Sequence, residues 1–457
     1  MIVGENKRRS ELANDNGIEG LVQPGRVHRR VYTDPAIFEI EMERLFGQSW
    51  LYVGHQSQVS NAGDFFCTRL GREPVVLVRH GTGDKNGGDI KVLFNRCGHR
   101  GAKVVATEGG SASEFRCCYH GWTYATDGRL ISVPVRQGYP DGTVDIADSA
   151  YGMQAVPRVA SYRGFIFASL SVTGPSLTDF LGHMTTSFDD LVDRAPDGEI
   201  EVAGGIARHA YRGNWKLIFE NVNDGLHPLS VHLSSIEAAR AQDDAVWSDG
   251  AGEIGIRQMR QNGAPLEFWD RQVGLWAYPF GHSYLGDYHD DEKLAVARQN
   301  PSFQDYIEIM EAKKGGERAR QILGVTRWNT NIYPTISFMS QFRQLRVIQP
   351  VAVDRTDVLG FCFRLKGAPE KMFRDTIQFA NVTNASASPV LTDDLETYDR
   401  LRGGLESSGN DWVTMSRGLG RDVADGHGGL QAENGLSELH IRNMFDSWSR
   451  YLGGAES

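Results

Sequence analysis

The sequence lacks the features that would mark it for a membrane, a nucleic acid or secretion. None of its apolar runs approaches the roughly 20 residues that a membrane-spanning helix needs, although the chain has 457 residues. Its formal net charge is −10 and it has no basic run, so we expect no nucleic-acid partner. The opening segment MIVGENKRRSELANDNG has no apolar stretch after its basic residues. We therefore expect no signal peptide, no membrane contact and a cytoplasmic protein.

Cysteine is also scarce, because the whole chain has five. So few cysteines in a chain of this length exclude a disulfide framework. Cys67 and Cys362 lie alone in apolar, strand-like segments, and we expect both to be buried free thiols. Cys97, Cys117 and Cys118 are clustered, and clustered cysteines in a reducing compartment more often bind metal or react. The candidate site therefore begins with these three residues.

Length and pattern predict an α+β protein of more than one domain. Residues 1–45 read as a polar arm leading into a helix. Residues 46–170 contain short apolar runs with Gly and Asp between them, including a hairpin turn at Gly128, and predict a small antiparallel β domain. Residues 171–457 mix strands with segregated helices, the last of which Ser437 can cap. No internal repeat or low-complexity tract is present.

Two short segments each offer one thiol and one imidazole. Cys97 and His99 are separated by one residue, and Cys117 and His120 by two, with seventeen residues between the pairs. Four such ligands could hold a tetrahedral zinc ion. In zinc fingers, however, the chain usually pairs cysteine with cysteine and histidine with histidine. The alternating order suits a two-iron cluster, in which two thiolates hold one iron and two neutral imidazoles the other.

A second group of metal-binding residue types lies in NWKLIFENVNDGLHPLSVH. Asp224 and His227 are three residues apart, which places both on one face of a helix. His232 follows five residues later, where an ideal helix would have turned it about 140° away. Pro228 removes a helical hydrogen bond and could supply the bend that brings the imidazoles together. Taken alone, two histidines and an aspartate more often have a structural role.

The segments CGHRGAKVV and CCYHGWTY resemble the Rieske [2Fe–2S] motifs of aromatic-ring-hydroxylating oxygenases, and ENVNDGLHPLSVH resembles the iron motif of their catalytic α subunits. The resemblance covers roughly residues 40–452. It implies a Rieske β domain over residues 46–170 and a catalytic domain over 171–457, with an antiparallel sheet flanked by helices. It also implies that a [2Fe–2S] cluster is held by Cys97, His99, Cys117 and His120, and a mononuclear Fe(II) by His227, His232 and Asp394.

Several positions depart from the motifs or leave a choice. Cys118 stands where these proteins usually carry Pro, and could compete with Cys117 as a ligand. Asp393 is the alternative to Asp394 in SPVLTDDLETYDRLRGGL, but Asp393 with Glu396 also fits a capping box at a helix start. Leu226 replaces the usual Tyr. The resemblance further implies that Leu226 and Asn221 contribute to the substrate pocket.

The resemblance implies cis-dihydroxylation of an aromatic ring with O2 and two electrons from NAD(P)H. A reductase, often with a ferredoxin, would supply the electrons. The α subunits would form an α3 trimer, or an α3β3 assembly with a small β subunit. Asp224 would link His227 to His120 of the partner subunit. The alternatives are a Rieske monooxygenase or demethylase and, outside the oxygenases, a Rieske electron carrier. A carrier would need no second iron.

The substrate is least defined by the sequence. The segment FMSQFRQLRVIQPVAVDRTDV resembles the corresponding region of enzymes that act on aromatic carboxylates. A carboxylate is best bound by a planar guanidinium fork. The arginines that could provide one in this part of the chain are Arg257, Arg260, Arg343 and Arg346. We therefore expect an aromatic substrate, with an aromatic carboxylate as the leading class.

Overall fold

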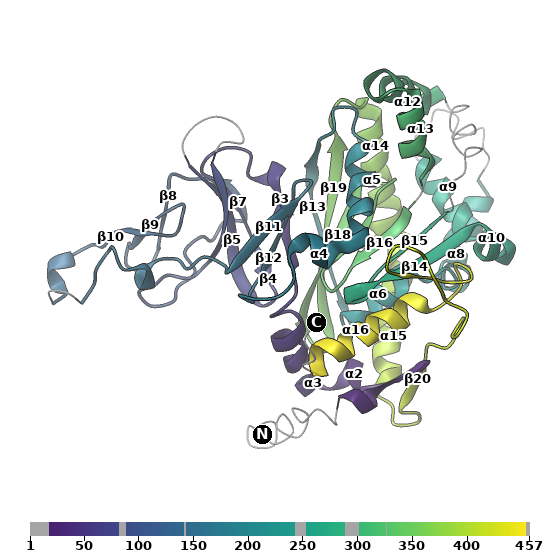
Figure 1. Ribbon diagram of the computed structural model, residues 1–457, viewed down its shortest axis with the longest axis horizontal. Helices are drawn as coiled ribbons and strands as arrows, with labels where there is room; N and C mark the ends of the chain where they lie inside the picture. The colour runs from purple at the N-terminus through teal and green to yellow at the C-terminus, as the bar shows by residue number, and fades with distance from the viewer. Residues whose placement is uncertain are drawn as a thin grey trace. The chain divides into compact units, whose positions relative to one another are not determined.

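The computed structural model describes residues 18–81, 88–140, 143–242, 253–287, 301–325 and 327–453. The chain divides into two compact units (Figure 1). One consists of Phe46–Leu177, and the other of Met1–Leu45 together with Thr178–Ser457. Mixed helices and antiparallel sheets confirm the predicted α+β class.

The Phe46–Leu177 unit is built from three antiparallel sheets. The first has the order β6–β5–β4–β7 and comprises Asp89–Phe94, Glu73–His80, Asp64–Leu70 and Gly109–Ser111. The second, β10–β9–β8, comprises Leu130–Ser132, Thr123–Ala125 and Glu114–Arg116. The third, β11–β12–β3, comprises Arg158–Tyr162, Phe165–Ser169 and Leu51–His55. Gly128 has a φ of 95° in the β9–β10 turn, which confirms the hairpin expected there.

A nine-stranded antiparallel sheet forms the centre of the other unit. Its order is β13–β19–β18–β17–β16–β15–β14–β22–β21. In that order the strands comprise Ile200–Arg212, Arg355–Leu365, Gln344–Ala352, Ile336–Met339, Arg327–Ile332, His282–Asp287, Val273–Tyr278, Leu430–Gln431 and Val423–Ala424. A small sheet of β1 (Val22–Gln23), β2 (Arg26–His28) and β20 (Trp412–Thr414) lies in the same unit.

Helices cover this large sheet, with α14 along β19 and α16 along β14 (Figure 1). The helices are α2 (Arg30–Thr33), α3 (Pro35–Ile40), α4 (Leu177–Leu181), α5 (Thr185–Asp193), α6 (Lys216–Val222), α7 (Pro228–Val231), α8 (Leu233–Arg240), α9 (Glu253–Asn262), α10 (Leu266–Arg271), α12 (Pro301–Lys314), α13 (Gly316–Gly324), α14 (Glu370–Phe379), α15 (Leu391–Leu405) and α16 (Leu439–Gly453). Two π-helical turns, Glu41–Leu45 and Ala380–Asn384, follow α3 and α14. Among the described residues, none of the helices is both long and apolar enough to cross a bilayer.

A buried charge explains why the N-terminal segment belongs to the unit with the large sheet. Glu41 is fully buried, and its Oε1 accepts hydrogen bonds from Lys216 Nζ at 2.5 Å and Trp448 Nε1 at 2.7 Å. Its Oε2 accepts from Trp215 Nε1 at 2.8 Å. A buried ion pair is tolerated only when its remaining polar atoms are also satisfied, and here the indoles satisfy them. This network joins the turn after α3 to α6 and α16.

The two isolated cysteines are less enclosed than expected. Cys67 in β4 and Cys362 in β19 are half-buried, so the prediction of full burial was wrong for both. In β19 the partly exposed residues largely alternate with buried ones, so Cys362 lies on a partly covered face, whereas Cys67 lies in a run of three accessible residues of β4. Burial nevertheless raises the pKa of each thiol to about 11, which keeps both protonated and unreactive at neutral pH.

Candidate metal centres

Two loops of the Phe46–Leu177 unit share one backbone conformation. In each, the N–H of a cysteine donates to the carbonyl five residues on, and its own carbonyl accepts from the glycine four residues on. These residues are Cys97, Gly101 and Ala102 in one loop and Cys117, Gly121 and Trp122 in the other, with distances of 2.8–3.0 Å. Both glycines have positive φ, 75° and 71°, which a residue with a side chain rarely adopts. The two loops therefore present their ligands in similar ways.

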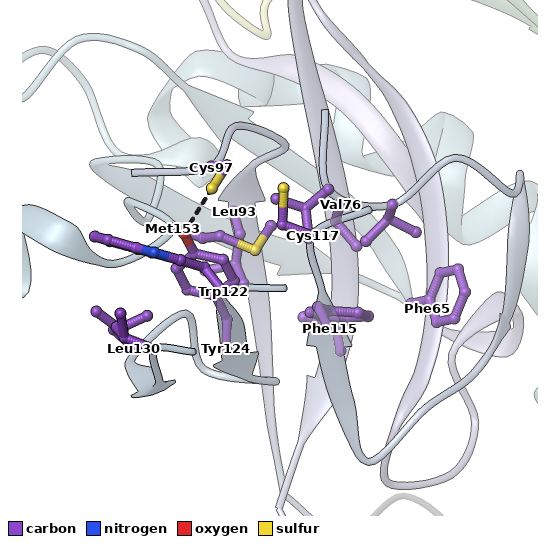
Figure 2. Close-up of a cluster of buried hydrophobic side chains, with 14 residues drawn as sticks. Phe65, Val76, Leu93, Cys97, Phe115, Cys117, Trp122, Tyr124, Leu130 and Met153 are labelled. Atoms are coloured by element: carbon purple, nitrogen blue, oxygen red, sulfur yellow. Dashed lines mark hydrogen bonds between the residues drawn. The ribbon is translucent and has the colours of Figure 1, made fainter. Parts of the chain in front are cut away.

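The thiols lie inside the unit, whereas the imidazoles lie near its surface. Cys97 and Cys117 are 2% and 3% exposed and belong to an apolar cluster with Trp122 and Tyr124 (Figure 2). The Tyr124 hydroxyl lies 3.0 Å from Cys97 Sγ. Burial raises the pKa of Cys117, while the backbone N–H groups of the two residues preceding Gly121 favour its thiolate. Such N–H groups can also donate to a bound sulfur cluster.

The two histidines face each other and leave a buried nitrogen without a partner. The rings of His99 and His120 are 4.7 Å apart, and His99 stacks on Trp122 at 4.9 Å. His99 Nδ1 is buried and has no hydrogen-bond partner among the described residues. A buried polar atom normally has a partner, so this one fits a metal ligand. Cys118 is exposed, whereas Cys117 is buried.

The histidines of the second group lie at a helix break. Helix α6 ends at Val222, so the prediction that Asp224 and His227 share a helix face was wrong. The Asp224 carboxylate accepts a hydrogen bond from Leu226 N at 2.8 Å, which stabilises a turn instead of a helix. Gly225 packs so closely that a Cβ there would lie 2.5 Å from the Gly435 carbonyl. This contact fixes the position of the turn.

Pro228 begins the next short helix, α7, as a proline at a first helical position commonly does. His227 immediately precedes α7, and His232 lies between α7 and α8. The backbone at His232 is not helical, with φ −96° and ψ 21°. The predicted break is therefore present on both sides of α7, and it turns the two imidazoles toward each other, with ring centres 5.3 Å apart.

His227, His232 and Asp394 form a compact group. Asp394 Oδ1 lies 3.7 Å from His227 Nε2 and 3.5 Å from His232 Nε2. The three ligand atoms all lie within 4.8 Å of one another, so one metal ion could be shared by all three side chains. Burial lowers the pKa of both histidines, which favours the neutral imidazoles that bind metals. Two histidines and one carboxylate suit a non-haem iron.

His227 and Asp394 each have an outer hydrogen-bond partner, and His232 has a carboxylate nearby, beyond hydrogen-bond distance. His227 Nδ1 lies 2.8 Å from the Asp224 carbonyl oxygen, and Asn221 Nδ2 donates to Asp394 Oδ1 at 3.0 Å. His232 Nδ1 lies 3.6 Å from Asp393 Oδ2. Contacts of this type fix the tautomer and orientation of ligands to a metal.

The capping box expected from Asp393 and Glu396 is absent from α15. The helix begins at Leu391, and the Leu391 N–H donates to Ser388 Oγ at 3.0 Å. Asp393 therefore lies inside the first turn, and the prediction of a cap there was wrong. The Ser388 side chain, three residues before the helix begins, instead satisfies the N–H of its first residue.

The Asp224 carboxylate has a partner that sequence reasoning missed. Its Oδ1 lies 3.0 Å from Arg417 Nη2, and the two residues are 193 positions apart in the chain. Arg417 also lies 3.6 Å from Glu438. No local pattern signals such a long-range ion pair. Asp224 Oδ2 makes no hydrogen bond to any residue in the described part of the chain.

A pocket opens beside the three-residue group. Its described lining contains Asn221, His227, His232 and Asp394. Leu226 is not among these residues, which contradicts the expectation that it forms part of the pocket wall.

Comparison with known proteins identifies both units. Residues 49–152 match the family model of the Rieske [2Fe-2S] domain. Residues 194–454 match the model of the ring hydroxylating alpha subunit, catalytic domain. The chain is 32% identical to the large subunit of a 2-halobenzoate 1,2-dioxygenase from Burkholderia cepacia, over 86% of this chain and 80% of the other. It is 34% identical to the alpha subunit of a Pseudomonas putida toluate 1,2-dioxygenase, over 89% and 84%.

Solved structures share the fold. A naphthalene 1,2-dioxygenase mutant bound to phenanthrene superposes with a TM-score of 0.79 at 23% identity, covering 96% of this chain and 95% of the other. Family models, relatives and fold agree with the resemblance seen in the sequence. This chain belongs to the catalytic α subunits of the Rieske aromatic-ring-hydroxylating dioxygenases, enzymes that use a Rieske [2Fe–2S] cluster and a mononuclear iron.

Proposed function

We propose that this protein is a terminal oxygenase that cis-dihydroxylates the ring of an aromatic carboxylate. One ring double bond, O2, two electrons and two protons yield one cis-dihydrodiol. The observation that carries the proposal is the His227–His232–Asp394 group, which lines a pocket together with aromatic and aliphatic side chains. The two relatives are named for benzoate-type substrates, which supports an aromatic carboxylate as the substrate class of this protein.

The residues of this chain would divide the work between two centres. Cys97 and Cys117 would hold one iron of the [2Fe–2S] cluster and His99 and His120 the other, with Cys118 left free. His227, His232 and Asp394 would hold the mononuclear iron. When bound, the cluster supplies electrons and the iron, with open coordination positions, activates dioxygen.

The outer residues would keep the iron ligands ready to bind. The Asp224 carbonyl and the Asp393 carboxylate face the outer nitrogens of the histidines, so their inner nitrogens are presented as bases. Asn221 donates to the Asp394 oxygen nearest both imidazoles and helps to hold it in place. The Asp394 carboxyl has a pKa raised by burial, and bound iron would offset this by stabilising the carboxylate.

Electrons would come from NAD(P)H through a reductase, alone or with a ferredoxin. The chain would act in an α3 or α3β3 assembly in the cytoplasm. Exposed His120 supports this arrangement, because a histidine at the surface of the Rieske unit is accessible to another subunit. In the catalytic unit, the Asp224 Oδ2 atom makes no hydrogen bond within the described chain. This atom could therefore accept a hydrogen bond from another subunit, which also supports the assembly.

The test is product analysis with isotopically labelled O2. The purified protein is supplied with NADH and a Rieske reductase system and offered benzoate-type substrates. A cis-dihydrodiol containing two labelled oxygen atoms is expected. A phenol or a dealkylated product with one labelled atom would instead establish a monooxygenase or demethylase. Electron uptake without oxygen incorporation across the substrate panel would support a carrier.

A further inference from the structure

The pocket beside the iron ligands has an apolar part and a polar part. Most of the apolar lining comes from Leu285, Trp328, Met339, Phe379 and Val390. The polar lining, apart from the iron ligands and their neighbours Asn221 and Asp224, comes from Gln258, Asn262, Asn329, Arg346, Thr383 and Asn384. A flat apolar ring with one charged substituent would match such a division. The identity of that substituent depends on the charge of the polar part.

Of the four candidate arginines, only Arg346 is part of the described pocket lining. Arg343 is buried, and donates from Nε to Thr376 Oγ1 at 2.6 Å and from Nη2 to a carbonyl of α14, so its role is to hold α14 on the sheet. Arg260 donates to the carbonyls of Ala239 and Gln242, which joins α9 to α8. Arg257 is exposed on α9. None of these three lines the pocket.

Arg346 lies in the middle of β18, and small neighbours leave it uncovered. Its partners across the sheet are Ser337 on β17 and Gly360 on β19. Its Nη2 donates to Asn329 Oδ1 and lies 3.4 Å from Ser337 Oγ. Within the described chain, its Nε and Nη1 form no hydrogen bond. One edge of the guanidinium is thus held by the sheet, and the remaining donors are available.

Arg346 has no carboxylate in direct contact with it among the described residues, although Asp394 attracts it from beyond ion-pair distance. The other charged residues of the lining are Asp394, committed to the iron group, and Asp224, paired with Arg417 at 3.0 Å. Burial lowers the pKa of Arg346, as expected for a cation withdrawn from water. A half-buried cation without an anion in contact is costly, and an anionic ligand would relieve that cost.

We infer that Arg346 is the residue that binds the substrate carboxylate, with Asn329 holding the guanidinium in place. The inference rests on the proposed ring dihydroxylation and identifies the residue that selects its substrate class. The carboxylate would accept from the free edge of the fork, which matches two oxygen atoms at once. With that end fixed, the ring would lie against the apolar lining, and the same ring edge would be presented to the iron ligands in each turnover.

The test compares aromatic acids with neutral counterparts of similar shape. The pairs are benzoate with toluene, ortho-chlorobenzoate with ortho-chlorotoluene, and meta-toluate with meta-xylene. Ring hydroxylation is measured for the parent protein, Arg346→Met, Arg346→Lys and the matched control Arg257→Met. Binding of radiolabelled benzoate is measured separately by anaerobic equilibrium dialysis. Iron content and Rieske absorbance verify that each variant is loaded and folded.

Loss of a hydrogen-bonded charge partner should weaken benzoate binding by about tenfold to hundredfold in Arg346→Met. The preference for acid over neutral counterpart in kcat/KM should fall by a similar factor, while turnover of the neutral compound persists. Arg346→Lys should keep part of the preference, because it keeps the charge and loses the fork. Arg257→Met should behave like the parent protein. If Arg346→Met does not fold, benzoate binding to Arg346→Lys is the decisive measurement. Unchanged benzoate affinity in Arg346→Lys would argue against binding by a guanidinium fork.

Three results would overturn the inference. An undiminished acid preference in Arg346→Met would place the carboxylate elsewhere but keep the proposed substrate class. If the parent protein dihydroxylates only the neutral compounds, Arg346 does not bind a substrate carboxylate and the substrates are not aromatic carboxylates. The proposed ring dihydroxylation would still hold. A fully loaded parent protein that hydroxylates no compound of either kind would contradict the proposed function itself.

Discussion

Two adjacent carboxylates show how position within one helical turn decides a residue's role. Asp394 is 8% exposed, and its Oδ1 faces both imidazoles. The preceding Asp393 approaches the outer nitrogen of His232 and lies 3.4 Å from Ser234 Oγ. Successive helical residues point about 100° apart, so one carboxylate can reach the inner side of an imidazole while its neighbour reaches the outer side. Substitution of Asp394 and substitution of Asp393 should therefore have different effects on iron binding and activity.

We predict that Asp394→Ala will lose mononuclear iron and turnover while the Rieske cluster remains intact. The substitution removes an anionic oxygen ligand, which a hard Fe(II) site requires. Asp393→Ala, the matched control, should retain measurable activity and lose about 10-fold to 100-fold in iron affinity, as outer partners of metal ligands typically do. Iron analysis, visible absorbance and a product assay are the measurements. Full activity in Asp394→Ala with loss in Asp393→Ala would reverse the assignment.

A buried histidine away from the iron group links stability to pH. His282 lies at the start of β15, with Nε2 2.9 Å from the Phe180 carbonyl and Nδ1 accepting from Tyr333 N at 3.2 Å. These two contacts define a neutral imidazole, and burial lowers its pKa to about 4. An unfolded histidine takes up a proton near pH 6.5, so between about pH 6.5 and about pH 4 the unfolded state binds more protons.

We therefore predict that acidification through this window will lower the free energy of unfolding, by up to about 1.4 kcal/mol per pH unit for His282. Above the window the contribution is fully present, and below it no further loss arises from this residue. Denaturant unfolding of the catalytic unit, followed by tryptophan fluorescence from about pH 7 to about pH 4.5, measures the slope. The slope reports how many more protons the unfolded state binds, and His282→Gln should lower that number by close to one. Equal slopes in both proteins would rule out the linkage.

At the scale of elements, the paired loops explain why Cys118 need not compete with Cys117. The matching hydrogen bonds place Cys117 at the loop position that Cys97 occupies in the other loop. Cys117 is 3% exposed, whereas Cys118 is exposed. A change of ligand would need the loop to shift by one residue, which would break both backbone bonds and move Gly121 out of its positive φ.

We predict that Cys117→Ser will lose the visible absorption of the cluster and that Cys118→Ser will keep it. Serine offers no thiolate to the iron at position 117, whereas position 118 faces solvent. Absorbance and electron paramagnetic resonance of the reduced proteins are the measurements. Cys67→Ser serves as a control for the loss of a thiol elsewhere in the unit. A normal Rieske signal in Cys117→Ser would disprove the assignment.

The elements that sequence reasoning predicted well are those set by nearby residues. The β9–β10 hairpin needed only a glycine at the turn. The cap of α16 needed only Ser437, whose Oγ accepts from Leu439 N at 3.2 Å. The proline that begins α7 likewise marked the distortion between the histidines. The motifs with their metal-binding residue types were also visible, because their spacing is local.

The elements that it missed depend on contacts between distant segments. The end of α6 depends on Gly225 meeting a carbonyl of residue 435, which no local pattern records. The selection of Arg346 over three other arginines depends on its strand neighbours Ser337 and Gly360. The ion pair of Arg417 with Asp224 spans almost half of the chain. Burial and register, which decide these cases, emerge only when the sheet is assembled.

For the whole molecule, function depends on electrons moving from the Rieske unit to the iron of the catalytic unit. Asp224 is the residue of the catalytic unit that we propose for this transfer, toward His120 of the partner subunit. Its Oδ1 is occupied by Leu226 N and Arg417, and its backbone carbonyl faces His227. The link to His227 within the chain therefore runs through the carbonyl, which leaves the carboxylate Oδ2 for the partner. The side chain and the backbone of one residue would then serve the two centres.

We predict that Asp224→Asn will separate electron transfer from metal binding. Asparagine keeps the size and the backbone carbonyl, so iron content and chemical reduction of the cluster should be near normal. It lacks the negative charge and replaces one acceptor oxygen with an NH2 donor, so the charge-assisted hydrogen bond from a cluster histidine is lost and the reduced cluster should fail to re-oxidise when substrate and O2 are added. Arg417→Gln, which retains the carboxylate, is the matched control and should remain competent for transfer. Rapid-mixing absorbance and single-turnover product measure the two steps. Product from reduced Asp224→Asn equal to that of the parent protein would show that electrons take another route.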